Sequence, residues 1–509
     1  MKMNKVIVID YGSQYNQLIT RRIRHKNVFV EVVSPTAPIE LTKDLKAIIL
    51  SGGPSSVYEE GAPRLSEAII NSGLPILGIC YGMQLIAQYF GSRVEKGVVR
   101  EYGKNEITLL KEDVLFKGLS KVQTVFMSHS DHVTDVIEPL DLLSTSAYAN
   151  AIIKHTSKPI YGLQFHPEVT HSVEGEQLIE NFLFEVAKIQ PDWNIEDFIT
   201  NKVSEIKDVV KDQHVILGLS GGVDSTVCAA LLHKAIGNQL VCIFVDTGLL
   251  RKHEAIEVLK NYEVFKDLNI IKVDAKEQFY QALKGVKDPE EKRKIIGRVF
   301  FEVFEQEKEK HNYASFLAQG TIYPDVIESL STNGGKTTIK SHHNVGGLPK
   351  QSTFKILEPL RELFKDEVRK VGFELNLDET LVNRHPFPGP GLGVRILGEI
   401  DESRVKILQE ADDVFITLLR KHQLYEKVSQ AFCVLLPVKS VGVMGDNRTY
   451  ENVLAIRSVD TTDFMTATFS RLPFEFLEEV ATTIINKVEG INRVVYDITS
   501  KPPGTIEWE

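Results

Sequence analysis

The chain has 509 residues, of which 43% are hydrophobic and 25% charged, a composition typical of a soluble globular protein. At roughly 100 to 200 residues per domain, this length excludes a single small binding module and predicts three or four domains. Lysine and arginine (59) are outnumbered by aspartate and glutamate (69), giving a formal net charge of −10. No global positive field therefore attracts nucleic acid or anionic lipid, and anionic ligands need local sites.

The four cysteines lie far apart, at positions 80, 228, 242 and 433. They form no CxxC pair and no close cluster with histidine, which argues against a zinc site, an iron-sulfur centre and a disulfide framework. A reducing, cytoplasmic compartment fits best. The apolar run at 6–9 is too short for a secretory signal, and glycine, proline and amide residues interrupt the longest uncharged stretch, at 68–92. We expect no membrane segment.

Residues 1–190 are predicted to form an α/β domain with a mostly parallel sheet, because short apolar runs alternate with helix-like segments. The expected strands are at 6–10, 47–50, 75–80, 151–154 and 160–165. The segment at 189–198, IQPDWNIEDF, mixes proline, tryptophan and acids before an amphipathic stretch at 199–210. It predicts a domain boundary.

A second α/β series spans 200–385, with expected parallel strands at 214–220, 239–246, 268–274 and 314–320. The segment at 384–395, RHPFPGPGLGVR, contains three prolines and three glycines and predicts a loop or linker. Beyond it, an expected helix at 405–424 and strands at 432–445 and 493–499 suggest a smaller α+β domain, 386–509. The predicted fold class is therefore α/β, with two successive open parallel-sheet domains followed by this smaller one.

Residues 75–87, PILGICYGMQLIA, predict a strand, a sharp turn and a helix. Cys80 stands between two glycines at the turn, which is the G-x-nucleophile-x-G elbow with cysteine in place of serine. The helix N-terminus stabilises negative charge on the sulfur, and the amide of Tyr81 can point at a developing oxyanion. We expect the second oxyanion donor at Gly53, in the loop after the strand at 47–50.

The candidate base for this nucleophile is His166, at the end of the strand in IYGLQFHPE. Glu168 lies two residues on, so both side chains face the same way on extended chain. A carboxylate beside a histidine fixes its tautomer, which completes a nucleophile, base and orienter. A free cysteine is most often a buried structural thiol, but the elbow and the HPE pairing favour catalysis by Cys80.

A second glycine-rich turn follows the strand at 214–219, where the amides and hydroxyls of SGGVDS can cradle a polyanion at a helix N-terminus. It lacks the lysine of a Walker A loop, so γ-phosphate transfer is a poor fit. The loop consists of Ser220, Gly221, Gly222, Val223, Asp224 and Ser225. Asp246 ends the next strand, where an adenosine could bind; a plain helix cap explains it equally well.

Residues 5–190 closely resemble a class I glutamine amidotransferase domain, through GICYGMQ, SGGP and HPE. The resemblance implies that Cys80 attacks the side-chain amide of glutamine, forms a glutamyl thioester, and releases ammonia and then glutamate. It also implies that glutamine is held by Gln84 and the segment at 127–131, which includes Ser128 and His129.

SGGVDS resembles the signature of the N-type ATP pyrophosphatases, which cleave ATP between the α- and β-phosphates and activate an acceptor oxygen as an adenylate. The resemblance implies that the loop binds pyrophosphate. Asp224 is the candidate ligand for Mg²⁺ bound with ATP, since magnesium takes hard oxygen ligands. We expect no organic cofactor.

Across the whole chain, eight motifs resemble the family of glutamine-hydrolysing GMP synthetases: GICYGMQ, FHPE, LSGGVDS, AQGTIYPDVIES, KSHHN, RHPFPGPGLGVR, SVGVMGD and DITSKPPGTIEWE. The resemblance implies conversion of XMP, ATP, glutamine and water to GMP, AMP, pyrophosphate and glutamate, by a homodimer formed through the C-terminal domain. It places the XMP contacts at Arg293, Lys501, Ile506 and Glu507.

The polar segment at 319–347 predicts a mobile lid rather than a metal site, because adjacent histidines on a strand point in opposite directions. The resemblance maps Asp325, Glu328, Lys340, His342 and His343 onto a lid over ATP and XMP. Two alternatives stay open: another amidotransferase-coupled adenylating ligase, which only the lid and the C-terminal domain exclude, and a non-catalytic glutamine or nucleotide sensor, against which the intact Cys80 site and SGGVDS argue.

Overall fold

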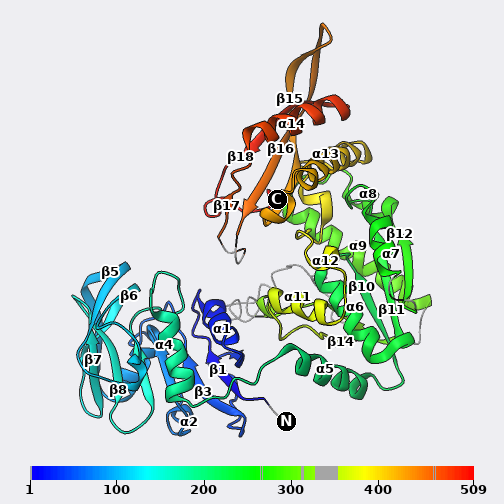
Figure 1. Cartoon of the computed structure of the whole chain (residues 1–509). Coiled ribbons are helices and arrows are strands. Elements are labelled where there is room, and N and C mark those ends of the chain that lie inside the picture. The colour runs from blue at the N-terminus through cyan, green and yellow to red at the C-terminus, as the bar shows by residue number, and fades with distance from the viewer. Residues whose placement is uncertain are drawn as a thin grey trace. The chain divides into compact units, whose positions relative to one another are not determined.

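The computed structural model describes residues 3–509 except 264, 266, 311–313, 327–353, 462, 463 and 465. Two compact units make up the chain (Figure 1): the first is built mainly on Met1–Phe198, and the second on Ile199–Tyr323 and Ile339–Glu509. The break at residue 198 falls at the end of the predicted boundary segment. No helix in the described ranges is both long and apolar enough to cross a membrane.

A nine-stranded sheet, in the order β2-β1-β3-β4-β9-β8-β7-β5-β6, forms the first unit. Five neighbouring strands are parallel: β1 (Lys5–Ile9), β2 (Phe29–Val33), β3 (Leu45–Leu50), β4 (Ile76–Ile79) and β9 (Ile160–Leu163). The other four are antiparallel: β5 (Arg93–Leu109), β6 (Val122–Asp135), β7 (Leu140–Thr145) and β8 (Asn150–His155).

Helices α1 (Asn16–Arg24), α2 (Glu67–Ile70), α3 (Tyr81–Tyr89) and α4 (Gly175–Asn181) accompany this sheet. The β4–α3 segment is buried along its whole length from Ile76 to Ala87 because it has apolar residues on every side. This burial fixes the position of the turn at Cys80.

The second unit contains a five-stranded parallel sheet in the order β12-β11-β10-β13-β14. Its strands are β10 (His214–Leu219), β11 (Leu240–Asp246), β12 (Asn269–Asp274), β13 (Ala314–Ala318) and β14 (Lys355–Leu357). Its helices include α5 (Ile195–Val210), α6 (Val223–Ile236), α7 (Glu254–Tyr262), α8 (Lys276–Leu283), α9 (Pro289–Lys310), α11 (Lys365–Glu374) and α12 (Glu379–Val382). The predicted fold class of two parallel-sheet α/β segments is confirmed.

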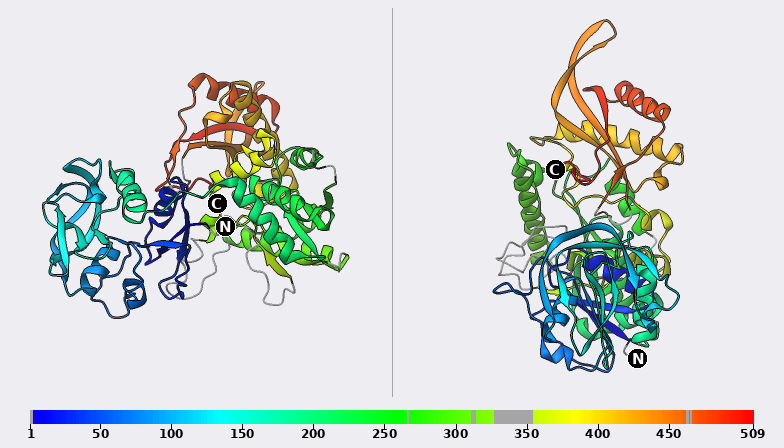
Figure 2. Two further views of the ribbon diagram at one scale, coloured as in Figure 1. Left: turned by 60° about the horizontal axis from the view of Figure 1, so that its bottom comes forward. Right: turned by 90° about the vertical axis from the view of Figure 1, so that its left-hand side faces the viewer.

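The C-terminal part of this unit is the predicted smaller α+β segment. It comprises β15 (Gln430–Met444), β16 (Asn447–Asp460), β17 (Thr468–Phe469), β18 (Ile491–Asp497), α13 (Glu402–Lys421) and α14 (Phe474–Lys487). Its long β15–β16 hairpin extends beyond the other elements of the unit (Figure 2). One apolar core joins Ile243 of the parallel sheet to Phe415 and Ile456, so the proposed domain division at 385/386 stays a prediction.

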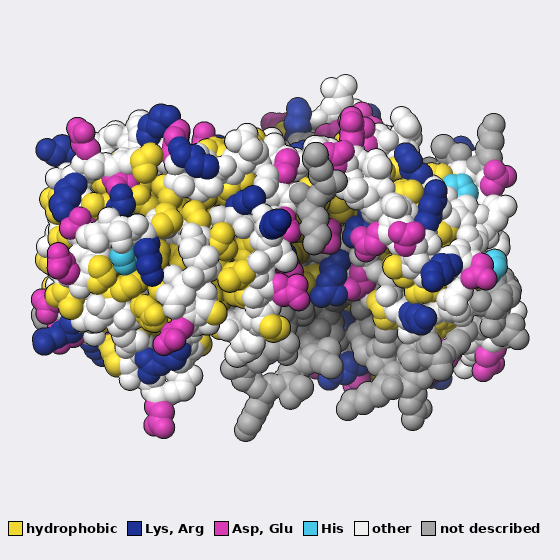
Figure 3. Space-filling model, turned by 90° about the horizontal axis from the view of Figure 1, so that it is seen from below, with side chains coloured by type: hydrophobic (Ala, Val, Ile, Leu, Met, Phe, Trp, Pro, Cys, Tyr) yellow, Lys and Arg dark blue, Asp and Glu magenta, His cyan; other side chains and the backbone are white. Residues whose placement is uncertain are grey.

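Charged side chains of both signs are interspersed on the face shown in Figure 3.

Candidate active sites

The elbow predicted around Cys80 is confirmed as local structure. Cys80 lies between β4 and α3 with φ 52° and ψ −105°, and its amide donates a 2.6 Å hydrogen bond to the Leu163 carbonyl. A positive φ is costly for a residue with a side chain and persists only where its surroundings impose it. The strained turn places the 6% exposed Cys80 directly before the N-terminus of α3.

The two flanking glycines are required by close approach. A Cβ on Gly78 would lie 2.5 Å from the carbonyl carbon of Gly82, and a Cβ on Gly82 would collide with the Leu50 carbonyl oxygen. Both obstacles are backbone atoms, which cannot move aside as a flexible side chain would. Helix α3 can therefore pack against β3 and β4 only with glycine at both positions.

Replacing Gly82 by alanine should lower the free energy of unfolding by about 1–3 kcal/mol, since the added methyl group overpacks the turn. Urea denaturation would measure the change. Gly372→Ala is the matched control because Gly372 also lies inside a helix, α11, without a positive φ, and the three nearest atoms to a Cβ there are side-chain atoms at 3.1 Å or more. Equal losses in the two variants would contradict the close-approach argument.

His166 and Glu168 form a buried pair, with His166 Nδ1 2.8 Å from Glu168 Oε1. The pair is 4% and 1% exposed, respectively. The Ser172 hydroxyl donates to the His166 carbonyl at 2.6 Å, and Arg22 Nε donates to the Glu168 carbonyl at 3.2 Å. The edge of the Tyr15 ring lies against the imidazole, 4.9 Å between centroids. The imidazole is thus fixed in orientation from several sides.

Burial by itself would lower the pKa of His166, but the Glu168 carboxylate and a hydrogen bond with Cys80 raise it to about 10. His166 is therefore protonated near pH 7 in this arrangement. A protonated imidazole next to the sulfur can stabilise negative charge there and supply a proton to a leaving group.

The raised pKa of His166 predicts a pH-dependent stability. The folded-state value of about 10 exceeds the unfolded value of about 6.5, so this contribution is complete below pH ~6.5 and is lost as pH rises toward 10. The free energy of unfolding should fall over that window, by at most about 1.4 kcal/mol per pH unit. Urea titrations followed at Trp193, in a Trp508→Phe background, would measure it.

In that experiment, His166→Gln should flatten the pH dependence, whereas His171→Gln, at an exposed histidine, should leave it intact. A wild-type curve that is flat between pH 6.5 and 10 would contradict the assigned charge state.

Cys80 and His166 both lie next to Gly52. A Cβ built on Gly52 would lie 3.2 Å from His166 Cε1 and 3.7 Å from Cys80 Cβ. Gln164 Nε2 donates to the Cys80 sulfur at 3.7 Å, and the thiol lies 3.9 Å from the Ser128 carbonyl oxygen. Gln164 is completely buried. Sequence reasoning missed Gln164, which lies just after β9 ends at Leu163 and two residues before His166.

The candidate oxyanion donors are the amides of Gly53 and Tyr81. Tyr81 begins α3, where the first amides have no intrahelical acceptor. In the part of the chain described, neither amide donates a hydrogen bond. Gly53 packs against the backbone of Tyr11, with a built Cβ only 2.5 Å from its carbonyl oxygen. These two amides remain available to a ligand.

The residues predicted to hold glutamine line the same region. Gln84 Nε2 donates to the Asp131 carbonyl at 2.8 Å, and His129 Nε2 lies 3.2 Å from Glu101 Oε2. Burial, with His132 nearby, lowers the pKa of His129 to about 4, so His129 is neutral near pH 7. These contacts support the walls of the site, and glutamine binding by Gln84, Ser128 and His129 stays a prediction.

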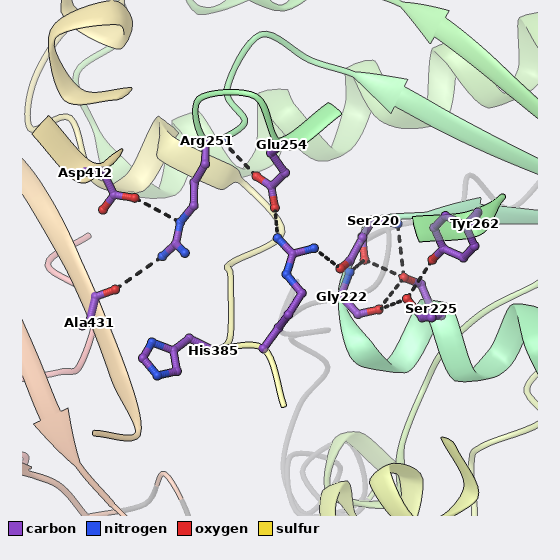
Figure 4. Close-up of polar contacts among 12 residues, drawn as sticks. Ser220, Gly222, Ser225, Arg251, Glu254, Tyr262, His385, Asp412 and Ala431 are labelled. Carbon is purple, nitrogen blue, oxygen red and sulfur yellow. Dashed lines mark hydrogen bonds and ion pairs between the residues drawn. The ribbon is translucent and has the colours of Figure 1, made fainter. Parts of the chain in front are cut away.

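The predicted phosphate loop connects β10 to α6 in the second unit (Figure 4). Gly221 has a φ of 73°, and Ser225 Oγ lies 3.0 Å from both Ser220 Oγ and the Gly222 carbonyl. The Thr226 hydroxyl pairs with Tyr262 Oη at 2.7 Å. The loop is thus held by its own hydroxyls at a helix N-terminus, as an anion site requires.

Asp224 lies in the first turn of α6, with its Oδ2 2.5 Å from Lys365 Nζ. Its Oδ1 is buried and has no hydrogen-bond partner. A buried carboxylate oxygen without a partner is costly unless a cation or donor reaches it, so the residue fits a magnesium ligand. The described residues contain no group of three or more His, Cys, Asp or Glu that could hold a metal ion alone.

Asp246 is not a helix cap, because α7 begins only at Glu254. Its Oδ1 accepts from the Gly248 amide at 3.2 Å, and its Oδ2 lies 3.1 Å from Lys276 Nζ. The cap alternative is therefore wrong. Adenosine binding at this strand end stays a prediction.

The C-terminal segment is docked within the second unit, as predicted. Glu507 receives two hydrogen bonds from the buried Arg395, at 3.0 and 2.8 Å, and Ile506 belongs to a small apolar cluster. Arg293 donates to the Glu509 main chain, and Lys501 Nζ to the Phe464 carbonyl at 2.7 Å. These contacts do not test whether the four predicted residues bind XMP.

Of the predicted lid residues, Asp325 lies in a helical segment at 323–326. The others lie outside the described residues: Glu328, Lys340, His342 and His343.

Three family models match the chain. Residues 7–186 match glutamine amidotransferase class-I, residues 193–293 match NAD synthase, and residues 417–508 match the GMP synthase C terminal domain. The glutamine-hydrolysing GMP synthase of Mesoplasma florum is 57% identical over 100% of both chains. That of Fusobacterium nucleatum is 56% identical, again over 100% of both. A solved glutamine amidotransferase from Thermotoga maritima is 21% identical, covering 37% of this chain and 100% of its own, with a TM-score of 0.33, too low to bear on the argument.

Proposed function

The chain belongs to the glutamine-hydrolysing GMP synthase family, and from this we propose that it makes GMP from XMP by coupling two reactions, one in each compact unit. The first unit releases ammonia from glutamine. The second activates XMP with ATP and replaces the activated oxygen by that ammonia. The observation that carries the first half is the buried His166–Glu168 pair beside the strained Cys80 elbow.

In the proposed glutaminase reaction, the Cys80 sulfur attacks the side-chain carbonyl of glutamine as a thiolate, its proton having passed to His166. The amides of Gly53 and Tyr81 hold the resulting oxyanion. Protonated His166 gives its proton to the departing ammonia, leaving a glutamyl thioester on Cys80. His166 then takes a proton from the water that attacks the thioester, which releases glutamate. Glu168 keeps the imidazole oriented throughout.

In the proposed second reaction, the loop at 220–225 holds the β- and γ-phosphates of ATP. The C2 oxygen of XMP attacks the α-phosphorus, a new O–P bond forms, and pyrophosphate leaves. Ammonia then attacks C2, and AMP departs with the former XMP oxygen. Mg²⁺ bound with ATP would neutralise phosphate charge, and Asp224 would hold it. Arg293, Lys501, Ile506 and Glu507 are the proposed contacts to XMP.

The experiment that tests this function is an assay for AMP, pyrophosphate and GMP with XMP, ATP, Mg²⁺ and glutamine, omitting one component at a time. All three products should require XMP, ATP and Mg²⁺, and glutamine should be replaceable only by an ammonium salt. AMP formed with another acceptor would favour a different adenylating ligase, and binding without turnover would favour a sensor. Light scattering at micromolar protein tests the proposed homodimer, and a monomeric mass would refute it.

A further inference from the structure

Two ion pairs, Arg384–Glu254 and Arg251–Asp412, connect the phosphate loop to the C-terminal sheet, and a hydrogen bond from the Arg251 backbone amide to Glu254 joins them (Figure 4). Arg384 Nη1 donates to the Gly221 carbonyl at 2.8 Å, and its Nη2 donates to Glu254 Oε1 at 2.7 Å. The other Glu254 oxygen accepts from the Arg251 amide at 2.9 Å. Arg251 Nε then lies 3.1 Å from Asp412 Oδ2 on α13. We call these four residues the Arg384–Asp412 network.

The network is shielded from solvent. The side chains of Glu254 and Asp412 are 2% and 3% exposed, and those of Arg384 and Arg251 are 19% and 15% exposed. Removing one charge from either ion pair leaves its partner buried without compensation, and the hydrogen bond from the Arg251 amide to Glu254 makes the two pairs depend on one another. A change in the position of Arg384 at the phosphate loop therefore changes the stability of the Arg251–Asp412 pair at β15.

The far end of the network lies on one short stretch of β15. Asp412 Oδ1 accepts from the Cys433 amide at 3.0 Å, and Arg251 Nη2 donates to the Ala431 carbonyl at 3.4 Å. The neighbouring Gln430 donates to Glu507 Oε1 at 2.7 Å. The same stretch of β15 thus contacts both the network and a proposed XMP residue.

The Phe387 ring makes a second connection between the network and the residues that contact Glu507. The guanidinium of Arg251 lies 5.2 Å from the centre of the Phe387 ring, and that of Arg395 lies 5.1 Å from it. Arg395 is the residue that binds Glu507. Next to Arg384, His385 stacks on Tyr425 at 3.8 Å, which fixes the backbone from which Arg384 reaches the loop.

The geometry points to the Arg384–Asp412 network as a set of positioning residues that couple occupancy of the phosphate loop to the XMP-binding end of β15, an inference that rests on the proposed function. An anion bound in the loop changes the position of the loop backbone, including the Gly221 carbonyl that accepts a hydrogen bond from Arg384. The network transmits this displacement to Asp412 and β15. ATP and XMP then strengthen each other's binding by the same factor, as linkage requires.

Calorimetric titration with α,β-methylene-ATP and Mg²⁺ tests this coupling, because the analogue cannot be cleaved at the bond that ATP loses. In the wild type, saturating XMP should tighten binding of the analogue by at least about fivefold. In Arg384→Met and in the nearly isosteric Glu254→Gln, that factor should fall to about one. Asp412→Asn should also abolish the factor, although Asp412 pairs with Arg251 and Cys433 rather than with the loop, while leaving the affinity for the analogue alone within about twofold.

The control is Lys421→Met, which breaks an exposed ion pair with Glu479 in the same unit and should retain the wild-type factor. A factor that persists in folded Glu254→Gln and Asp412→Asn would overturn the inference, even if affinities fell, because the residues would then be merely structural. A wild-type factor of one would also overturn it. Failure of the wild type to bind either nucleotide would instead refute the proposed function.

Discussion

Replacing Cys80 by alanine should abolish GMP formation from glutamine, by about four orders of magnitude or more, while GMP formation from an ammonium salt stays within about twofold of wild type. The substitution removes the nucleophile of the first unit and nothing from the second. Because the α3 turn is held by backbone contacts of its flanking glycines, alanine at position 80 should keep the fold. Parallel assays of GMP with glutamine and with ammonium chloride measure both rates.

Cys242→Ala is the matched control, since Cys242 is a completely buried thiol on β11 of the second unit. It loses the same sulfur atom and should keep both activities. If Cys80→Ala lost the two activities equally, ammonia production and XMP amination would not be separate, and the two-site proposal would fail.

The local form of both sites could be predicted from sequence because each depends on short-range backbone geometry. Glycines on either side of Cys80 imply a turn that only glycine permits, and the collision of a Cβ at Gly82 with Leu50 is the physical reason. In the same way, SGGVDS predicts a strand, a turn and a helix, and Gly221 does adopt a positive φ.

The antiparallel half of the first sheet could not be predicted as easily. Along β6, buried and more exposed residues alternate, and polar side chains such as His129 and Asp131 lie on the buried face. A pattern search for apolar runs passes over such a strand, because polar side chains share its buried face with the apolar Val125, Met127 and Val133, and the buried polar groups need hydrogen-bond partners.

Contacts between segments that are distant in the sequence could not be predicted from it either. Gln164 approaches the Cys80 sulfur from a position 84 residues away, just after β9, and Arg384 meets the Gly221 carbonyl across 163 residues. A residue pattern carries no distance between such positions. Arg384 stands in the proline- and glycine-rich segment that was predicted as a linker, yet Leu392 and Arg395 in it are completely buried.

The second large effect is expected for Asp224→Asn, which should lower AMP and pyrophosphate formation by about 10²- to 10³-fold with either nitrogen source. Asparagine keeps the shape of the side chain but removes the charge from an oxygen that is buried without a partner. Both the proposed magnesium ligand and the counter-charge of Lys365 are lost together. Raising Mg²⁺ should restore little activity, since a neutral amide is a poor ligand for this cation.

The same substitution separates a magnesium role from a structural one. An acidic residue in the first turn of α6 stabilises that helix by only about 0.3–1 kcal/mol, so Asp224→Asn should unfold at nearly the wild-type urea concentration. The rate at which iodoacetamide alkylates Cys80 should also be unchanged, because Asp224 belongs to the other unit. Asp212→Asn removes an exposed carboxylate just before β10 and should keep full activity. Near-normal pyrophosphate release by Asp224→Asn would show that this carboxylate does not bind the metal, and a large loss of stability would show that its charge serves the fold.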